Sequence, residues 1–583
     1  MVTSKAEPSN SCWMLRDWIA AVVLFAATAD VVLWQNAHVA VLFDVGYVLN
    51  TAACIAFGQM PFRDFPLVHA PLTFLIQAAI IRLTGRVYFH HVLYAAVLGG
   101  FGTVLAWRIA LASLREHLAA AWTVAILVAA PLIFLGIYCI VPNPEYDSDC
   151  AFWILVAIWL VLQIDKAAHV RAGLAAGAAL ILPLFFKQNM GLPFLAAAIC
   201  GVLLLLSVKW FPRRQAPIAE GKRSILLSVL AGAGVALLAA LLLLHWTAGV
   251  ENYVHWTIRF AAQRRLPGFG DMMGIYREPS LAWTLPCVAI ALIVLYAVPG
   301  KNRWLRIAAF ALLSAPFLFT LTSLVLYDDA DERGDSLLAL WPLLLLLAAA
   351  LAIRNLVGLR RKPSLQALLP LVVLAAIHGT FMSQQVWGST YAIWPLLLLL
   401  MASLLAYLSD IRGVATLRWF VPALATIISV TLLVCGGFYT FSEERLSYAQ
   451  LPAGPVEHST FPELAGLSTP GPYLPEFDEL LRYSQANIPF NDGLILIPGE
   501  EPFYFATGRV PRFPVLLFDR TTDPYSPEEA ADLARLRKIR WLIVKRALQL
   551  NTDSNPEPAA TARALQVEFT LAAQLRGYDV YRR

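Results

Sequence analysis

Long apolar runs follow one another through most of this chain and leave it few ways to fold. Thirteen of them lie between residues 14 and 440, at 14–35, 90–112, 119–141, 150–165, 172–188, 190–208, 224–246, 281–299, 305–326, 336–353, 365–383, 389–408 and 419–440. A transmembrane helix needs about 20 largely apolar residues. Only 14% of the 583 residues are charged, against about 25% in a typical soluble domain. We therefore expect a polytopic, all-α membrane protein with about thirteen transmembrane helices.

Several other protein classes are excluded by what the sequence lacks. The first apolar run has no small-residue cleavage site, so we interpret it as a retained helix and not a signal peptide. The seven cysteines are scattered singly, without the spacing of a zinc site or a disulfide framework. Neither a Walker loop nor a strand followed by GxGxxG is present, which argues against an NTPase or a dinucleotide enzyme.

A fourteenth apolar run, 68–84, is short and interrupted by Pro71, Gln77 and Arg82, and it either spans the bilayer or lies along its surface. The positive-inside rule favours the surface. If 68–84 does not span and the N-terminus is cytoplasmic, twenty Lys and Arg residues fall on the cytoplasmic side and nine in or beside the outer loops. If it spans, this bias reverses. We therefore predict interfacial helices in an external loop 36–89, and a chain that ends outside the cytoplasm.

The composition changes after Tyr439. Residues 441–475 are rich in Pro, Ser and Gly and are predicted to form a linker between a membrane domain, 1–440, and a final domain, 476–583. The final domain reads as an alternation of helices and strands, typical of a small extracytoplasmic α/β domain. We expect its strands at 493–498, 514–518, 540–544 and 578–582, and its helices at 475–485, 527–538 and 558–575.

Three short motifs carry a family resemblance. The first outer loop reads FDVGYVLN, continues to PFRDF and ends in HAPL; the second contains PNPEYDSDC at 142–150; and FFKQNMG occupies 185–191. These resemble the membrane-embedded C-type glycosyltransferases, in particular the protein O-mannosyltransferase and aminoarabinose-transferase group (family 39-like). A fourth segment, QQVWGSTYAIWP at 384–395, is similar to a late external turn of that group. One departure is that Val45 follows Asp44, where many members have Asp-Glu.

The resemblance implies inverting transfer of a sugar, hexosyl or pentosyl, from a polyprenyl-phosphate carrier to an acceptor hydroxyl at the outer face of the membrane. It implies a general base within reach of the acceptor oxygen and cations on the leaving phosphate. The candidate catalytic residues are Asp44, Asp147 and Asp149. The candidate substrate-binding residues are Tyr47, Asp64, His69, Lys187, Gln188, Arg259, Arg264, Arg265 and Tyr391. The outer carboxylates could also bind a divalent cation, but no ligand spacing calls for one, and no other cofactor or nucleic acid is expected.

Structural roles compete with these functional ones. Asp44 could cap the helix that follows it, Lys187 could extend to the interface, and one of Asp147 and Asp149 could cap the next span. Asp64 fits a turn better than a substrate contact. A multi-spanning transporter or a flippase for lipid-linked sugars is the alternative function. The sequence leaves open the sugar, the acceptor (glycan, lipid or protein), the metal and the oligomeric state, and the compact loops favour a bacterial inner membrane.

Overall fold

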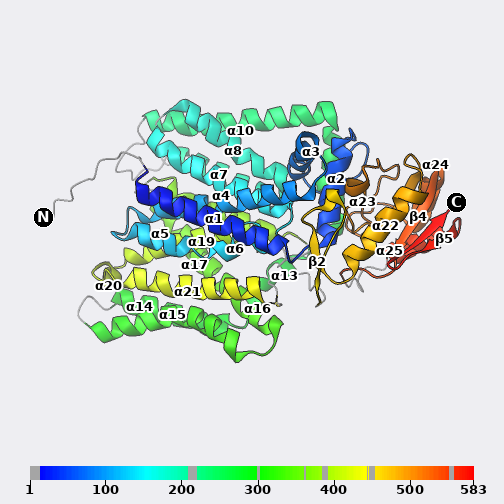
Figure 1. Ribbon diagram of the computed structural model, residues 1–583. Coiled ribbons are helices and arrows are strands. Elements are labelled where there is room, and N and C mark those ends of the chain that lie inside the picture. The colour runs from blue at the N-terminus through cyan, green and yellow to red at the C-terminus, as the bar shows by residue number, and fades with distance from the viewer. Residues whose placement is uncertain are drawn as a thin grey trace.

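A helical bundle and a small α/β domain at one of its ends make up the molecule (Figure 1). The computed structural model describes residues 13–167, 169–207, 220–297, 302–359, 363–383, 391–442, 444, 454–550 and 557–583. The basic stretches 209–214 and 360–362 and the first part of the late turn, 384–390, lie outside these residues.

Each of the thirteen predicted spans contains a helix of the bundle. These helices are α1 (Leu15–Asn36), α4 (Tyr88–Leu114), α5 (Ala121–Ala129), α6 (Leu132–Leu135), α7 (Tyr146–Ala167), α8 (Val170–Phe186), α9 (Gln188–Ser207), α10 (Glu220–Thr247), α14 (Leu281–Ala297), α15 (Arg303–Leu326), α17 (Leu340–Gly358), α18 (Leu369–Thr380), α19 (Trp394–Ser409) and α21 (Phe420–Phe441). Within the described residues, eight helices are long and apolar enough to cross a bilayer. The span expected at 119–141 is helical only to Leu135, because Pro131 separates α5 from α6 and the chain is extended at Gly136.

The outer surface of the bundle is apolar. Leu238, Leu243 and Trp246 of α10 are exposed, as are Ile19 and Val22 of α1. An exposed apolar surface of this extent is unfavourable in water and favourable against lipid chains. The protein is therefore an integral membrane protein, as the composition predicts.

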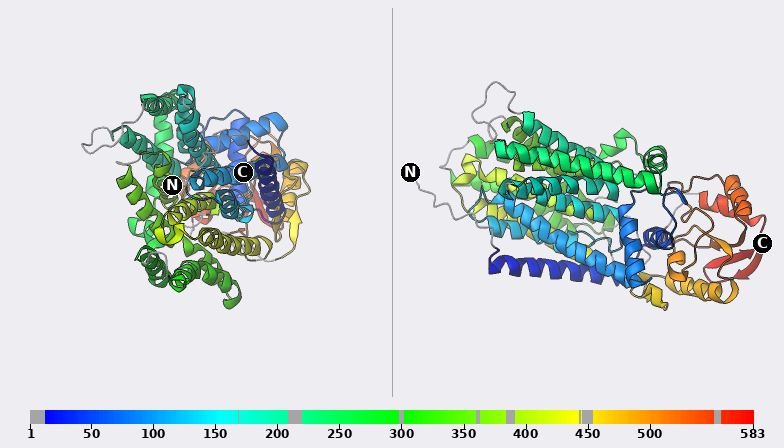
Figure 2. Two further views of the ribbon diagram at one scale, coloured as in Figure 1. Left: turned by 90° about the vertical axis from the view of Figure 1, so that its left-hand side faces the viewer. Right: turned by 90° about the horizontal axis from the view of Figure 1, so that it is seen from above.

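Two short helices, α2 (Leu42–Ala56) and α3 (Leu72–Thr84), lie across the end of the bundle and not along it (Figures 1 and 2). Their 15 and 13 residues are too few for a spanning helix. The chain between them turns through the PFRDF segment, where Met60 N donates to the Asp64 carboxylate at 2.7 Å. Both helices lie between the bundle and the C-terminal domain.

Shorter elements complete the bundle. Between α10 and α14 lie α11 (Val250–Val254), the π-helical η2 (His255–Phe260), α12 (Ala261–Arg265), α13 (Phe269–Met272) and η3 (Gly274–Arg277). The others are α16 (Ala330–Leu338), η4 (Gln366–Leu368) and α20 (Arg412–Ala415).

The C-terminal domain is built on a four-stranded sheet of order β3-β4-β6-β5. Strands β3 (Gly493–Ile497) and β4 (Ile539–Lys545) are parallel, whereas β6 (Tyr578–Arg582) runs antiparallel to both β4 and β5 (Thr570–Gln574). Its helices are α22 (Tyr473–Asn487), α23 (Phe503–Thr507), α24 (Pro527–Leu536) and α25 (Glu557–Gln566). The predicted linker region contains β1 (Val456–His458), η6 (Pro462–Leu464) and β2 (Ser468–Pro470), with β1 and β2 paired antiparallel.

Two of the expected C-terminal elements are wrong. The apolar stretch 514–518 is a loop, not a strand, although Val515 to Phe518 are buried; the segment follows Pro511 and Pro514, and Phe518 N donates to Pro498 O instead of to a strand. The helix expected at 558–575 ends at Gln566, and the chain continues as β5 because it pairs with β6. Pairing along a sheet edge overrides local helix propensity here.

The two faces of the sheet belong to different cores, because side chains alternate along a strand. Ile495 and Leu542 face α24 and α25. Leu494 and Ile543 face the other way, into a core that also contains Leu49 of α2. The first loop and the C-terminal domain therefore share one hydrophobic core.

Polar contacts fix α2 on this domain. Asn50 donates to Glu501 O at 2.8 Å and accepts from the backbone N–H groups of Tyr504 and Phe505 at 2.9 and 3.1 Å. Gln549 accepts from Leu42 N at 2.7 Å and donates to Ala40 O at 2.9 Å. Both side chains are buried, so each satisfies backbone groups that water does not reach.

The packing of α2 on the C-terminal domain can be tested at Gly46, where the two backbones come close together. A Cβ atom at Gly46 would lie 2.0 Å from the carbonyl oxygen of Glu500. We expect Gly46→Ala to lower the unfolding temperature in detergent, with a loss of about 1–3 kcal/mol from overpacking. Gly234→Ala is the matched control, because this glycine of α10 has nothing within 4 Å of the added methyl group. The close packing of α2 on Glu500 is contradicted if the two variants unfold at the same temperature as the wild type.

Candidate functional site

Asp44 lies at the end of the bundle, near the C-terminal domain and near the loop that precedes α7. It occupies the first turn of α2, where the partial positive charge of a helix N-terminus favours a carboxylate, and it is half-buried. Gln549 holds the first residue of this helix, so the C-terminal domain determines where Asp44 sits.

Glu145 links Asp44 electrostatically to an ion pair of Asp147 and Lys187. Asp147 forms a buried ion pair with Lys187, whose side chains are 5% and 6% exposed. Lys187 stands at the break between α8 and α9, with an extended backbone that ends the first helix. Glu145, in the loop before α7, lies close enough to both aspartates to feel their charges. The site thus combines three acids with one buried cation.

Glu145 favours its protonated form. Burial raises the pKa of this carboxyl well above its usual 4.5, and the neighbouring Asp147 and Asp44 charges raise the pKa further, while Lys187 opposes them. A proton on Glu145 leaves two negative charges in the cluster instead of three. Glu145 is not among the site residues predicted from the sequence, although it stands in the same PNPEYDSDC motif as the two aspartates.

His69 joins the cluster to Arg265. Its Nε2 accepts from Arg265 Nη1 at 2.8 Å, because a guanidinium can only donate. The proton of the neutral ring is therefore on Nδ1, which lies 3.0 Å from the Tyr47 hydroxyl. Burial, together with the positive charges of Arg265 and Lys187, holds the pKa of His69 well below its usual value. The ring also stacks on Tyr146 with centroids 4.0 Å apart.

An apolar cavity of about 430 Å³ opens beside this cluster. Its polar lining residues include His69, Lys187 and Arg265. The rest is largely apolar and is lined by side chains of α8, α9 and α10 and by Leu266, just after α12; they include Phe185, Leu192, Pro193, Leu237 and Leu241. Its size falls in the usual range of ligand sites, about 300–1,000 Å³. The shape and lining suit an amphiphile with an anionic head.

The remaining candidates divide into those near the cavity and those elsewhere. Gln188 braces the site, donating to Val68 O at 3.1 Å and Thr257 O at 3.0 Å. Arg264 donates to Arg520 O of the C-terminal domain at 3.3 Å. Arg259 is exposed on η2, and no contact described in this structure joins it to the acidic cluster.

Three candidates have structural surroundings and do not line this cavity. Asp149 is fully buried and accepts from the hydroxyls of Thr73, Tyr94 and Tyr138 at 2.6, 2.8 and 2.7 Å. Asp64 pairs with its neighbour Arg63. Tyr391 is buried before α19, in the main core of the bundle.

The loop 513–525, predicted in part as a strand, reaches this region. The negative charge of Asp519 is one of the influences that raise the pKa of Tyr47, after burial, which is the largest. Asp519 itself accepts from Thr521 N at 2.8 Å. Within the described residues, no group of three His, Cys, Asp or Glu side chains is arranged to hold a metal ion.

No protein-family model and no curated protein matches this sequence. Among solved structures, the chain aligns over 91% of its length with the apo oligosaccharyltransferase of Archaeoglobus fulgidus, covering 69% of that chain at 13% identity and a TM-score of 0.47. It aligns over 97% of its length with ArnT from Cupriavidus metallidurans, covering 98% of that chain. For ArnT bound to undecaprenyl phosphate the TM-score is 0.38 at 14% identity, and for the apo state it is 0.40 at 13%. Similarity at this level assigns neither an activity nor a residue's role to this protein.

The raised pKa of Glu145 predicts a pH dependence of stability. The folded chain holds a proton that the unfolded chain releases near its usual 4.5, so this group's contribution to stability is fully present below that pH and is lost as the pH rises through the folded-state pKa. We expect the advantage of Glu145→Gln over the wild type in unfolding temperature to be larger near about pH 8 than near about pH 5.

Glu251→Gln, at an exposed position of α11, serves as the control for this measurement. The same dependence on pH in wild type and Glu145→Gln would show that Glu145 is not the group responsible.

Proposed function

We propose that this protein is an inverting glycosyltransferase of the C-type membrane fold. It transfers a sugar from a polyprenyl-phosphate donor to an acceptor hydroxyl. One observation carries the proposal: the carboxylate of Asp44 lies beside a cluster whose cations form the head of an apolar cavity. A general base, a phosphate site and a lipid groove are the three parts that such a transfer requires.

The cavity receives the donor. Its apolar walls take the first isoprene units, and Arg265 and Lys187 face the phosphate at its polar end. Arginine suits phosphate because its planar fork donates two parallel hydrogen bonds. Lys187 is already paired with Asp147, so the phosphate competes with a carboxylate for this cation.

The chemistry balances with these groups alone. Asp44 accepts the proton of the acceptor hydroxyl as its oxygen attacks the anomeric carbon from the face opposite the phosphate. The bond from this carbon to the phosphate oxygen breaks, and the lipid phosphate leaves with both electrons. The positive charges of Arg265 and Lys187 stabilise the phosphate as its charge grows. Displacement from the opposite face inverts the anomeric centre.

The roles of the two other acids differ. Asp147, through its pair with Lys187, positions the cation that faces the phosphate. Asp149, held by three hydroxyl donors, supports the fold of the second loop. His69 positions Arg265 through its unprotonated Nε2.

The topology follows from the same proposal. The positive-inside count places the N-terminus in the cytoplasm and the C-terminal domain on the other side, in the periplasm if the membrane is a bacterial inner membrane. The site then faces away from the cytoplasm, and the loop 513–525 borders it. The acceptor enters between the bundle and this loop.

The deciding experiment is transfer of radiolabel from polyprenyl-phosphate sugars by purified protein. Asp44→Asn keeps the shape of the side chain and removes the base. We expect it to lower turnover by about 10²–10⁴-fold and to leave binding of the lipid phosphate within about twofold of the wild type. Turnover equal to that of the wild type would remove Asp44 from the mechanism.

Arg265→Gln separates binding from proton transfer. We expect it to weaken binding of polyprenyl phosphate by about tenfold or more, since it removes a charge-assisted contact. Arg259→Gln, on the exposed face of η2, is the matched control and should bind as the wild type does. No turnover with any donor, together with movement of lipid-linked sugar across liposomes, would instead support a flippase.

A further inference from the structure

Three side chains of the proposed site form a chain of hydrogen bonds that runs in one direction. Arg265 Nη1 donates to His69 Nε2 at 2.8 Å, and a guanidinium cannot accept in return. The neutral His69 ring therefore carries its proton on Nδ1 and donates it to the Tyr47 hydroxyl oxygen at 3.0 Å. Arg265 thus determines the direction of both hydrogen bonds.

The Tyr47 hydroxyl oxygen receives two hydrogen bonds in this arrangement. His69 Nδ1 donates one of them, and the backbone N–H of Val68 donates the other. A hydroxyl oxygen has about two lone pairs and one proton, so this oxygen has no capacity left to accept. In the part of the chain that the structure describes, the proton of this hydroxyl has no acceptor. The proton is therefore available to a ligand.

The Tyr47 hydroxyl remains protonated beside a positive charge. Burial, the largest influence, raises the pKa of Tyr47 above its usual 10.0. The charge of Arg265 and the hydrogen bond from Val68 lower this pKa but do not offset the effect of burial. Two donors and a nearby cation polarise the O–H bond. A polarised O–H forms its strongest hydrogen bond with an anion.

Tyr47 lies between the proposed base and the proposed phosphate site. It follows Asp44 on α2 by three residues, a spacing that places the two side chains on the same face of the helix. Its ring contacts that of His69 edge to face, with centroids 5.4 Å apart. His69 in turn lines the apolar cavity together with Lys187 and Arg265. The bond that breaks in the proposed transfer lies between these two regions.

We propose that the Tyr47 O–H is a third donor to the phosphate of the lipid, beside Arg265 and Lys187. This inference rests on the proposed function, which places a phosphate there. A hydroxyl that can only donate complements a phosphate oxygen, which only accepts, better than a sugar hydroxyl, which has a proton of its own to donate. The hydrogen bond strengthens as negative charge grows on the leaving phosphate, and the proton stays on Tyr47.

The test compares binding of polyprenyl phosphate with binding of the polyprenol of the same chain length, by native mass spectrometry of the purified full chain. Tyr47→Phe removes a single oxygen atom. We expect it to weaken binding of polyprenyl phosphate by about tenfold and to leave binding of the polyprenol unchanged. Tyr483→Phe, at a half-buried position of α22, is the matched control and should bind both lipids as the wild type does.

A second substitution strengthens the donor instead of removing it. With 3-fluorotyrosine in place of Tyr47, the phenol is more acidic and donates a stronger hydrogen bond, while its shape changes little. We expect this protein to bind polyprenyl phosphate about two- to threefold more tightly than the wild type. A hydroxyl that only accepts from His69 and packs in the site would not produce this gain, and its absence would contradict the donor role.

The outcomes separate this inference from the proposed function. If Tyr47→Phe binds polyprenyl phosphate as the wild type does and Arg265→Gln does not, Tyr47 makes no contact with the phosphate. The inference is then wrong, although the phosphate site stands. If the wild type binds polyprenyl phosphate no better than the polyprenol, the inference and the proposed function both fail.

Discussion

The docking of α2 on the C-terminal domain is the contact on which the proposed site depends. Beside the shared hydrophobic core, the C-terminal domain contains a buried polar cluster: Lys545 pairs with Glu500 and Glu501, all three buried, and Tyr578 donates to Glu501. Burial alone would lower the pKa of Lys545, but the two carboxylates raise it above its usual value. Such a buried cluster is costly to break by removing one partner. The cluster holds the segment 500–505 in place, and Asn50 of α2 forms hydrogen bonds with the backbone of this segment. The position of α2, and with it that of Asp44, therefore depends on the cluster.

Several acids can lie close together in the proposed site because nearby groups offset their negative charges. The N-terminus of α2 favours Asp44, Lys187 compensates Asp147, and Glu145 keeps a proton. His69 is neutral and therefore adds no positive charge to the cluster. Its Nε2 accepts from Arg265 and so orients this side chain. In the proposed reaction, the negative charge of Asp44 serves to accept a proton, and the positive charges of Arg265 and Lys187 serve to hold a phosphate.

Hydrophobic periodicity and the charge count predicted the bundle and the short helices of the first loop, because both depend on the local sequence and on the bilayer. They did not predict the loop 513–525 or β5, whose conformations depend on partners distant in sequence. Motif positions brought out Asp44, Asp147, His69 and Lys187 but could not separate Asp147 from Asp149. That distinction needs the positions of Thr73, Tyr94 and Tyr138, which lie in α3, in α4 and in the turn after α6. Glu145 was missed because its role comes from burial, which sequence spacing does not reveal.

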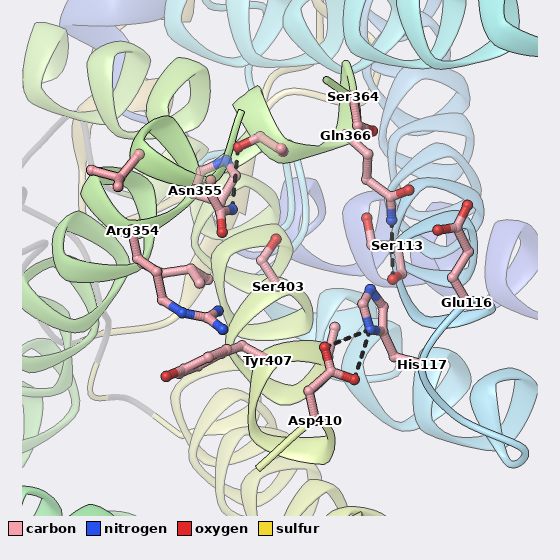
Figure 3. Close-up of a pocket in the computed structure, with 16 residues that line it drawn as sticks. Ser113, Glu116, His117, Arg354, Asn355, Ser364, Gln366, Ser403, Tyr407 and Asp410 are labelled. Carbon is pink, nitrogen blue, oxygen red and sulfur yellow. Dashed lines mark hydrogen bonds and ion pairs between the residues drawn. The ribbon is translucent and has the colours of Figure 1, made fainter. Parts of the chain in front are cut away.

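Different helices line the cavity beside Lys187 and Arg265 and the two cavities toward the other end of the bundle, which share Leu351, Arg354 and Tyr407. The first uses α8 to α12, and the other two use α14, α15, α17, α19 and α21 with the end of α4. Figure 3 shows the larger of these two, of about 560 Å³. Among the described lining residues, only the segment around α18 contributes to both ends: Pro370 lines the far cavity, and Met382 and Ser383 line the near one. Coupling between distant sites requires an element with two arrangements that both ligands bias. Most residues of α18 are buried in the main core of the bundle, and a single, well-packed helix is a poor candidate for such an element.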